Sequence, residues 1–471
     1  MKKRAQFPDS HTYTIMLRGL ATHSHNRTAV SSALSIYHSL FVPNSRVKPN
    51  VIHTNAALNV CARQNDMDAL WGIASRIPSK GPGAADNTTF TIILNALRQS
   101  VLADTDNADE SVVAEGKEKA VVHGRKLWAD VLHRWKQGDL LIDEKLVCAM
   151  GRLLIIGRRA RDQDDVLSLV EQTMNIPRLC PRLGVQARSQ LSTHVNSQVV
   201  QGDKQGDSLE LDDPFDIKLG PVGNSDGPRK SFSYATPGPA TLSLIMEACR
   251  SIGARRPATA YWELLTDPQG HGIRADHANK HAYLRILRQA RAAYDSVDFV
   301  REEMAVHPHM AKTYRIAMST CLRAVSVARS GDTAAIRAAN ELFELMEQRL
   351  PVLDVIALAQ YVEILKATND MSTLLRGIDL LITSDRKIQQ LEKVLRQAQT
   401  QDERLKAREL FGNLIGVLDG AIQKGVSKDH VKLFRVFKNR LASMKDKGRE
   451  EDEKVIRQKA AELEPLHEDW D

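Results

Sequence analysis

Short polar side chains recur at one place in a phrase that this 471-residue chain repeats. The phrase reads SHTYTIML, NTTFTIIL and AKTYRIAM, and VIHTNAAL aligns with it. The residue after the aromatic ring, or its aligned place, is called the marker. In the early copies the marker is Thr14, Asn55 or Thr91. Hydroxyl and amide groups donate and accept hydrogen bonds, so hydrogen bonding is the chemistry that this row offers.

No catalytic constellation accompanies these side chains. His277 and His281 stand four residues apart, as metal ligands on a helix do, but Ala278 takes the place of the glutamate that a zincin needs. The sequence has no H-x-E with paired cysteines, no Walker loop, no G-x-G-x-x-G and no G-x-S-x-G. The acidic run at 450–453 lies in one charged helix without an αβ pattern around it. We therefore expect no enzyme activity, no bound metal and no cofactor.

The spacing of the markers indicates a repeat architecture. The three early markers are 41 and 36 residues apart, and the later markers Ser243, His281 and Arg315 are 38 and 34 apart. A period in the mid-thirties with two helices per repeat is typical of helical-hairpin solenoids.

The best-defined repeat predicts its two helices directly. Apolar periodicity predicts a first helix over Val51–Arg63 and a second over Met67–Ile77, with Asp66 as the N-cap of the second. Neither helix can bury its apolar face against the other alone, so neighbouring repeats must cover both sides.

At these residues the chain resembles the pentatricopeptide repeat family. Besides the opening phrase, the likeness rests on a cysteine six places after the marker, at Cys61, Cys249 and Cys321, and on second helices such as ALSIY, ALW, AYW and ANELF. It extends over roughly residues 8–384 in seven or eight degenerate repeats. The resemblance implies an all-α, right-handed superhelical solenoid whose first helices line a concave RNA-binding face.

The same resemblance assigns base-reading pairs, each made of a marker and the residue just before the next repeat. One base per repeat is read in this way because the edges of single-stranded bases are free. By the family's habits, the first three pairs would prefer adenine, uracil and guanine respectively. The four pairs are Thr14 with Asn50, Asn55 with Asp86, Thr91 with Asp143, and Ser243 with Asp276.

The remaining markers leave an alternative open. They depart from the family pattern and are Cys148, His281, Arg315 and Ala359. The aliphatic residue expected three places before each marker is present only as Ile52 and Ile356. The later repeats could instead grip structured RNA through phosphates, or pack against ribosomal protein. The basic side chains available for phosphates are Lys145, Lys280, Lys312 and Arg315.

Composition shifts predict four parts. These are an N-terminal repeat block over 1–178, a disordered linker over 179–237, a second repeat block over 238–385, and a helical C-terminal region with a charged tail over 386–471. The acidic surplus at 104–119 in the third repeat is expected to be a loop or a helix extension on the outer face. An apolar stripe from Leu410 to Ile422 is expected to cap the solenoid.

The charge of the chain favours a polyanionic partner. The formal net charge is +7 and the isoelectric point is about 9.0. Seven bases against Asp9 place most of the excess in residues 1–60. Five well-separated cysteines indicate a reducing compartment. No apolar run is long enough to span a membrane, and the basic start at Met1 leads almost directly into a repeat. We therefore expect that earlier repeats and any targeting presequence are missing.

These observations lead to one functional expectation and one alternative. The chain is expected to bind single-stranded or structured mitochondrial RNA without catalysis, like fungal mitochondrial factors for small-subunit ribosomal RNA processing or intron splicing. It is also expected to take no small-molecule substrate and to insert into no membrane. The mitochondrial location follows from the resemblance alone. The alternative is a ribosome-associated subunit or a tetratricopeptide-like protein scaffold without an RNA ligand.

Overall fold

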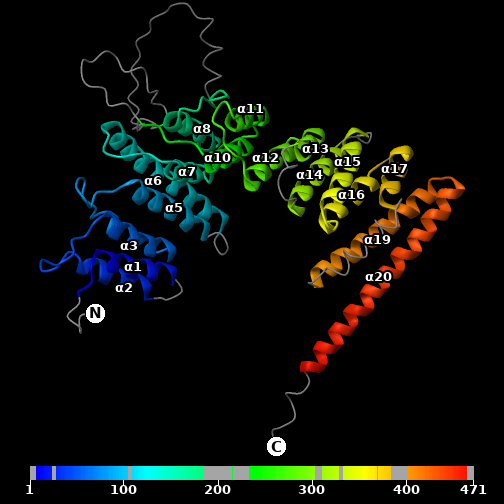
Figure 1. Ribbon diagram of the computed structural model, residues 1–471, viewed down its shortest axis with the longest axis horizontal. Coiled ribbons are helices and arrows are strands. Elements are labelled where there is room, and N and C mark those ends of the chain that lie inside the picture. The colour runs from blue at the N-terminus through cyan, green and yellow to red at the C-terminus, as the bar shows by residue number, and fades with distance from the viewer. Residues whose placement is uncertain are drawn as a thin grey trace, which may run out of the picture. The chain divides into compact units, whose positions relative to one another are not determined.

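The computed structural model describes residues 7–23, 28–103, 109–183, 215, 233–302, 310–327, 333–368, 370–382 and 401–463, the side chains of the last range only for 404–446. Every regular element in these ranges is an α-helix (Figure 1). The predicted all-α class is therefore confirmed. Residue contacts group the chain into an N-terminal body, residues 1–279, and a C-terminal body, residues 280–471. The four-part division predicted from composition stays a prediction.

The N-terminal body is a stack of helical hairpins. Its first helices are α1 (Ser10–Thr22), α3 (Val51–Arg63), α5 (Asn87–Ala103), α7 (Glu144–Ile155) and α10 (Pro239–Ser251). Its second helices are α2 (Ala29–Ser39), α4 (Met67–Ala74), α6 (Glu110–Gln137), α8 (Ala160–Met174) and α11 (Arg255–Thr266). Each first helix packs against its own second helix, and α1, α3, α5 and α7 each also pack against the first helix of the next repeat. This order of contacts is that of a solenoid, as predicted.

The C-terminal body continues the pattern. It contains α13 (Ala293–Glu302), α14 (Ala311–Val325), α15 (Thr333–Arg349), α16 (Val355–Lys366), α17 (Met371–Ile382), α19 (Gln401–Gln423) and α20 (Lys428–Leu463), while α12 (His277–Gln289) crosses the boundary of the bodies. Helix α14 packs against α16, and α15 packs against α17. Helix α19 covers α16 and α17 and pairs with α20 (Figure 1). Leu410, Phe411 and Leu414 are at most 2% exposed, which confirms the predicted helical cap.

The second repeat shows how closely sequence dictates local structure. Helix α3 has the predicted bounds, and the Asp66 carboxylate accepts the backbone N–H of Ala69 at 2.9 Å, as predicted for an N-cap. Helix α4 ends at Ala74 rather than Ile77. At this end of the helix the last hydrogen bonds join residues three apart and not four, as between the N–H of Ile77 and the carbonyl of Ala74 at 3.2 Å. Pro78 disfavours helical geometry in the residue before it, which explains the earlier end.

The long third repeat contains the predicted helix extension. Residues 110–119 lengthen α6 to 28 residues, whereas 104–108 lie outside the described part. Most of the predicted linker, 184–214 and 216–232, also lies outside it. Both of its described edges pack on the body. The indole of Trp135 donates to the carbonyl of Ser233 at 3.2 Å, and the N–H of Leu179 donates to the hydroxyl of Tyr261 at 2.9 Å. The repeats on either side of this segment are in contact, since α10 packs against α7 and α8.

Buried charges on α8 are neutralised by arginines from other segments. Asp165 is fully buried, and its carboxylate pairs with Arg125 at 2.6 Å and with Arg182 at 2.8 Å. Asp164 is 1% exposed and pairs with Arg178. Removing one member of such a cluster would leave an uncompensated buried charge, so the cluster fixes the segment after α8 to the body.

The cysteines serve packing. Cys61, Cys249 and Cys321 are fully buried, which confirms that this repeat position takes a small apolar side chain. Burial raises the pKa of the Cys61 thiol to about 11 and that of Cys249 to about 12, so both stay protonated. No group of metal-binding side chains is found in the part of the chain that the structure describes. Among the same residues, no helix is both long and apolar enough to cross a membrane.

A matched pair of glycine substitutions tests the packing of the first helices. A Cβ on Gly151 of α7 would lie 2.5 Å from Cδ2 and 2.8 Å from Cδ1 of Leu244 on α10, whereas a Cβ on Gly72 of α4 meets no atom within 4 Å. Overpacking costs about 1–3 kcal/mol, so Gly151→Ala should lower the free energy of unfolding. Gly72→Ala should raise it by about 0.5–1 kcal/mol, because the unfolded chain loses entropy. Urea unfolding followed by circular dichroism measures both, and a stabilised Gly151→Ala would contradict the tight α7–α10 contact.

Candidate nucleic-acid interface

The markers share one structural position. Each is the fifth residue of its first helix, as the starts of α1, α3, α5, α7 and α10 show for Thr14, Asn55, Thr91, Cys148 and Ser243. The second member of each predicted pair lies just before the next first helix and caps it. Asn50, Asp86, Asp143 and Asp276 all accept a backbone N–H three residues on, at 2.8–3.1 Å. A predicted base-reading pair is therefore a side chain from one helix and the N-cap of the next.

The structure brings one predicted pair into direct contact. The amide Nδ2 of Asn55 donates to Oδ1 of Asp86 at 3.0 Å. The hydroxyl of Thr89, the third residue of α5, lies 2.7 Å from Oδ1 of Asn55 and 2.9 Å from Oδ1 of Asp86. Asn55 and Asp86 are half-buried, while Thr89 is fully buried. Both amide atoms of Asn55 are thus held from the next repeat.

A second pair is joined through an intermediate side chain. Nδ2 of Asn279, the third residue of α12, donates to the hydroxyl of Ser243 at 2.9 Å and to the carbonyl of Pro239 at 2.7 Å. The backbone N–H of Asn279 donates to the Asp276 carboxylate at 2.8 Å. Asn279 is fully buried, Ser243 is half-buried and Asp276 is exposed. Sequence reasoning missed Asn279, although its place three residues after the cap was a usable signal.

The other two predicted pairs are not joined. Thr14 is 6% exposed, and its hydroxyl donates to the carbonyl of Ser10 in its own helix at 3.1 Å. Its predicted partner Asn50 forms a capping box with His53, whose ring reaches back to Ser10.

The pair in the third repeat is replaced by a neighbour. The hydroxyl of Thr91 donates to the carbonyl of Asn87 at 2.7 Å. Asp143 accepts the side-chain amide of Asn87 at 2.9 Å. Asn87, the first residue of α5, therefore occupies the contact to the next cap.

Two of the irregular markers, His281 and Arg315, are engaged within the C-terminal body. The ring of His281 is 4% exposed and lies 2.9 Å from the hydroxyl of Thr313. The guanidinium of Arg315 forms a forked ion pair with Asp354, at 2.9 Å from Nε and 2.6 Å from Nη2. Lys280 is 4% exposed, so the suggestion that it grips phosphates is wrong. The backbone of α12 turns this lysine inward.

The remaining lysines predicted to contact phosphates are exposed, unlike Lys280. Lys145 and Lys312 are exposed, and both lie at the second position of a first helix. Ile52 and Ile356, the two aliphatic residues at that same position, are 51% and 38% exposed. The second position therefore faces solvent in these repeats, which is the place that a base-flanking side chain needs.

A row of arginines was not predicted. Each lies four, seven or eight residues after a marker, and these spacings share one face of a helix. All are exposed or half-buried, and the row comprises Arg18, Arg63, Arg98, Arg152 and Arg250. Nε of Arg98 is buried without a hydrogen-bond partner. Only Glu247 brings a negative charge to the same positions in these five helices. Counting forward from the markers would have found them.

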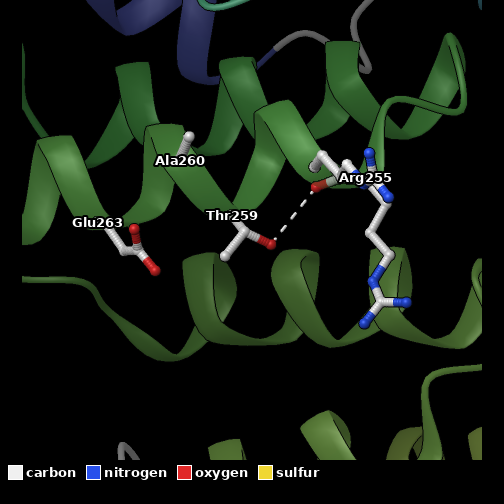
Figure 2. Close-up of a pocket in the computed structure, with 5 residues that line it drawn as sticks. Arg255, Thr259, Ala260 and Glu263 are labelled. Carbon is white, nitrogen blue, oxygen red and sulfur yellow. Dashed lines mark hydrogen bonds between the residues drawn. The ribbon is translucent and has the colours of Figure 1, made fainter.

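A surface hollow on α11 is a weaker candidate for a binding site. It has a volume of about 460 Å³ and is lined by five residues of α11. Figure 2 shows Arg255, Thr259 and Glu263 along this helix, with the Thr259 hydroxyl bonded to the carbonyl of Arg255 at 3.4 Å. All the lining residues belong to one helix, so a ligand would be contacted from one side only. They include no nucleophile paired with a base.

We expect the Arg315–Asp354 ion pair to make a measurable contribution to the free energy of unfolding. Asp354 also caps α16 through the N–H of Ala357 at 2.9 Å and is 9% exposed. Asp354→Ala should lower the free energy of unfolding by about 2 kcal/mol, from the lost cap and the lost ion pair. Asp9→Ala, which removes only an exposed cap of α1, should lower the free energy of unfolding by less than Asp354→Ala does. Equal losses in urea unfolding would show that the ion pair contributes nothing.

Comparison with known proteins adds a distant likeness. No protein-family model and no curated protein matches the sequence. The crystal structure of the pentatricopeptide repeat protein PPR10 in complex with an 18-nucleotide psaJ RNA element is similar at 15% identity, covers 93% of this chain and 53% of that one, and superposes with a TM-score of 0.39. PPR10 from maize aligns at 13% identity, 99% and 76% coverage and a TM-score of 0.19. This chain spans about half the length of the RNA-bound chain.

Proposed function

We propose that this chain is an RNA-binding protein of the pentatricopeptide repeat class and that the N-terminal body carries base recognition. The observation that carries the proposal is the joint between the second and third repeats. There a half-buried amide, Asn55, is held against the acidic cap Asp86 of the next helix at 3.0 Å. The joint around Ser243 repeats the arrangement with different side chains.

The chemistry of Asn55 suits a base edge. One N–H of its amide is used by Asp86 and one acceptor site by Thr89. An asparagine amide carries two N–H groups and a carbonyl with two lone pairs. One donor and one acceptor therefore remain, on the two outer sides of the amide. A nucleobase presents donors and acceptors on its Watson–Crick edge, so a hydrogen bond between one of these free groups and a splayed-out base fits this side chain. Uracil is the base that the family's habits assign to this pair.

The arginine row supplies the affinity that a few base contacts lack. Cationic side chains that neutralise phosphates release counterions, and this gain is independent of sequence. The row lies on the same helix faces as the markers, so one RNA strand can meet bases and phosphates together.

The biological role follows from this passive chemistry. We assign the protein to mitochondrial RNA maturation, in small-subunit ribosomal RNA processing or intron splicing. Its part is to hold an RNA segment single-stranded, or to mark a boundary, while separate enzymes act. The degenerate repeats and the helical carboxyl end, in which the chain resembles fungal mitochondrial factors, support this assignment, as does the basic first block of the sequence.

The C-terminal body favours a second role in the same molecule. Its markers bond to their own neighbours, His281 to Thr313 and Arg315 to Asp354. Groups committed in this way are poor base readers, because binding would first have to break an internal bond. A scaffold surface for a ribosomal or processing protein is the second candidate for this body.

Base reading by Asn55 predicts a separable effect on specificity. One hydrogen bond from an amide to a base contributes about 0.5–1.5 kcal/mol, so Asn55→Ala should weaken binding to the preferred RNA by about 3- to 10-fold. Arg98→Ala should instead weaken binding to all single strands and reduce the slope of log affinity against log salt by about 0.7. Filter binding at several salt concentrations, with RNAs selected by the intact protein from a random pool, measures both.

Two results of these binding experiments would contradict the proposal. A folded Asn55→Ala protein with unchanged affinity and unchanged base preference would remove base reading from the second repeat. Absence of any single-strand binding by the intact chain would favour the scaffold role.

Crosslinking in cells tests the assigned role. Ultraviolet crosslinking of the tagged protein, followed by sequencing of the attached RNA, should give a focused footprint in an unprocessed mitochondrial transcript. A footprint confined to mature ribosomal RNA would indicate a ribosomal component instead. RNA recovery no higher than from an untagged strain would contradict RNA binding altogether.

A further inference from the structure

One buried hydroxyl stands between the two members of the best-formed pair. Thr89 belongs to α5, yet its Oγ1 lies 2.7 Å from Oδ1 of Asn55, a residue of α3. The same oxygen accepts the backbone N–H of Asp86 at 3.1 Å. Thr89 is fully buried, so no solvent competes for its hydrogen. Thr89 therefore links its own repeat, the third, to the marker of the second repeat.

The number of available hydrogens and lone pairs decides which oxygen accepts the hydroxyl hydrogen of Thr89. Oδ1 of Asp86 already accepts the N–H of Thr89 at 2.8 Å and Nδ2 of Asn55 at 3.0 Å. Its two lone pairs are thereby used. The single hydroxyl hydrogen of Thr89 therefore goes to Oδ1 of Asn55. The result is a closed ring in which Asp86 takes the amide nitrogen of Asn55 and Thr89 takes the amide oxygen.

We propose that Thr89 is a positioning residue that sets the base preference of Asn55 by fixing the direction of its amide. This inference rests on the proposed RNA-binding function. A reversed amide would place its oxygen against the Asp86 carboxylate and exchange the donor and acceptor offered to a base. With the ring closed, only one order of donor and acceptor is presented to RNA.

The same position acts at other joints. The third residue of α12, Asn279, bonds to the marker Ser243 at 2.9 Å, and the third residue of α14, Thr313, bonds to the marker His281 at 2.9 Å. The third residue of α3 differs, because His53 reaches Ser10 instead of the marker Thr14. The third residue of a first helix thus serves the preceding marker where its side chain can reach it.

The test compares variants in a selection from randomised single-stranded RNA. The bound fraction is sequenced for the intact chain, Thr89→Val, Thr89→Ser and Asn55→Ala. Thr89→Val keeps the shape and the helical N–H but lacks the hydroxyl, so it should lose about 3- to 10-fold of the preference at one RNA position, the size expected for one hydrogen bond. Thr89→Ser should keep that preference. Asn55→Ala should lose the preference at the same position.

Thr12→Val is the matched control. Thr12 is also the third residue of a first helix, and its hydroxyl donates to the cap Asp9 at 2.6 Å. Its described contacts include no marker. The substitution therefore perturbs a cap in the same way and should leave the base preference unchanged. Melting followed by circular dichroism shows whether each variant is folded, and Thr89→Ala replaces Thr89→Val if the branched side chain prevents folding.

The outcomes separate this inference from the function on which it rests. If Asn55→Ala loses the preference while Thr89→Val and Thr89→Ala keep it, Thr89 does not position the amide. Loss in Thr89→Ser equal to that in Thr89→Val would equally overturn the inference, since the hydroxyl would then be irrelevant. If Asn55→Ala itself keeps the preference, base reading by the marker fails.

Discussion

The backbone N–H groups at the start of each first helix have no partner within the helix and must find acceptors elsewhere. In this chain Asn50, Asp86, Asp143 and Asp354 supply them. Because the repeats are stacked, a cap can also meet the fifth residue of the helix before it, as Asp86 meets Asn55 and Asp354 meets Arg315. At these two joints, helix capping and the presentation of the marker depend on the same side chain. A cap can serve recognition only while it keeps its acceptor role in the fold.

This shared use explains why the joints differ. At Asp86 the neighbouring marker is an amide, so carboxylate and amide form a polar joint with unused donors. At Asp354 the neighbouring marker is Arg315, so the same carboxylate closes an ion pair. The first joint leaves hydrogen-bonding capacity for a ligand, while the second consumes it. One substitution at the marker thus converts a recognition joint into a structural one without changing the helices.

Sequence periodicity predicted what depends on local spacing. The bounds of α3, the Asp66 cap and the buried cysteines follow from apolar faces and capping chemistry within a few residues. It did not predict that Asn87, rather than Thr91, meets Asp143, or that Lys280 is buried. Such contacts join residues tens of positions apart, and the rotamers on two packed helices decide which side chain reaches the cap. The arginine row was missed for a different reason, because only the markers were followed along each helix.

Under the proposed RNA-binding function, specificity and affinity lie on different parts of the same helices. The markers sit near the N-terminal ends, where caps orient them, and a marker such as Thr14 that is 6% exposed has little surface to offer. The arginines lie one to two turns further along, and one of them, Arg63, donates to the carbonyl of Ala21 at 3.1 Å. A strand held mainly by the arginines would bind with little regard to sequence. The few oriented markers would then select its register, so a chain with degenerate repeats can still bind one place on a long RNA.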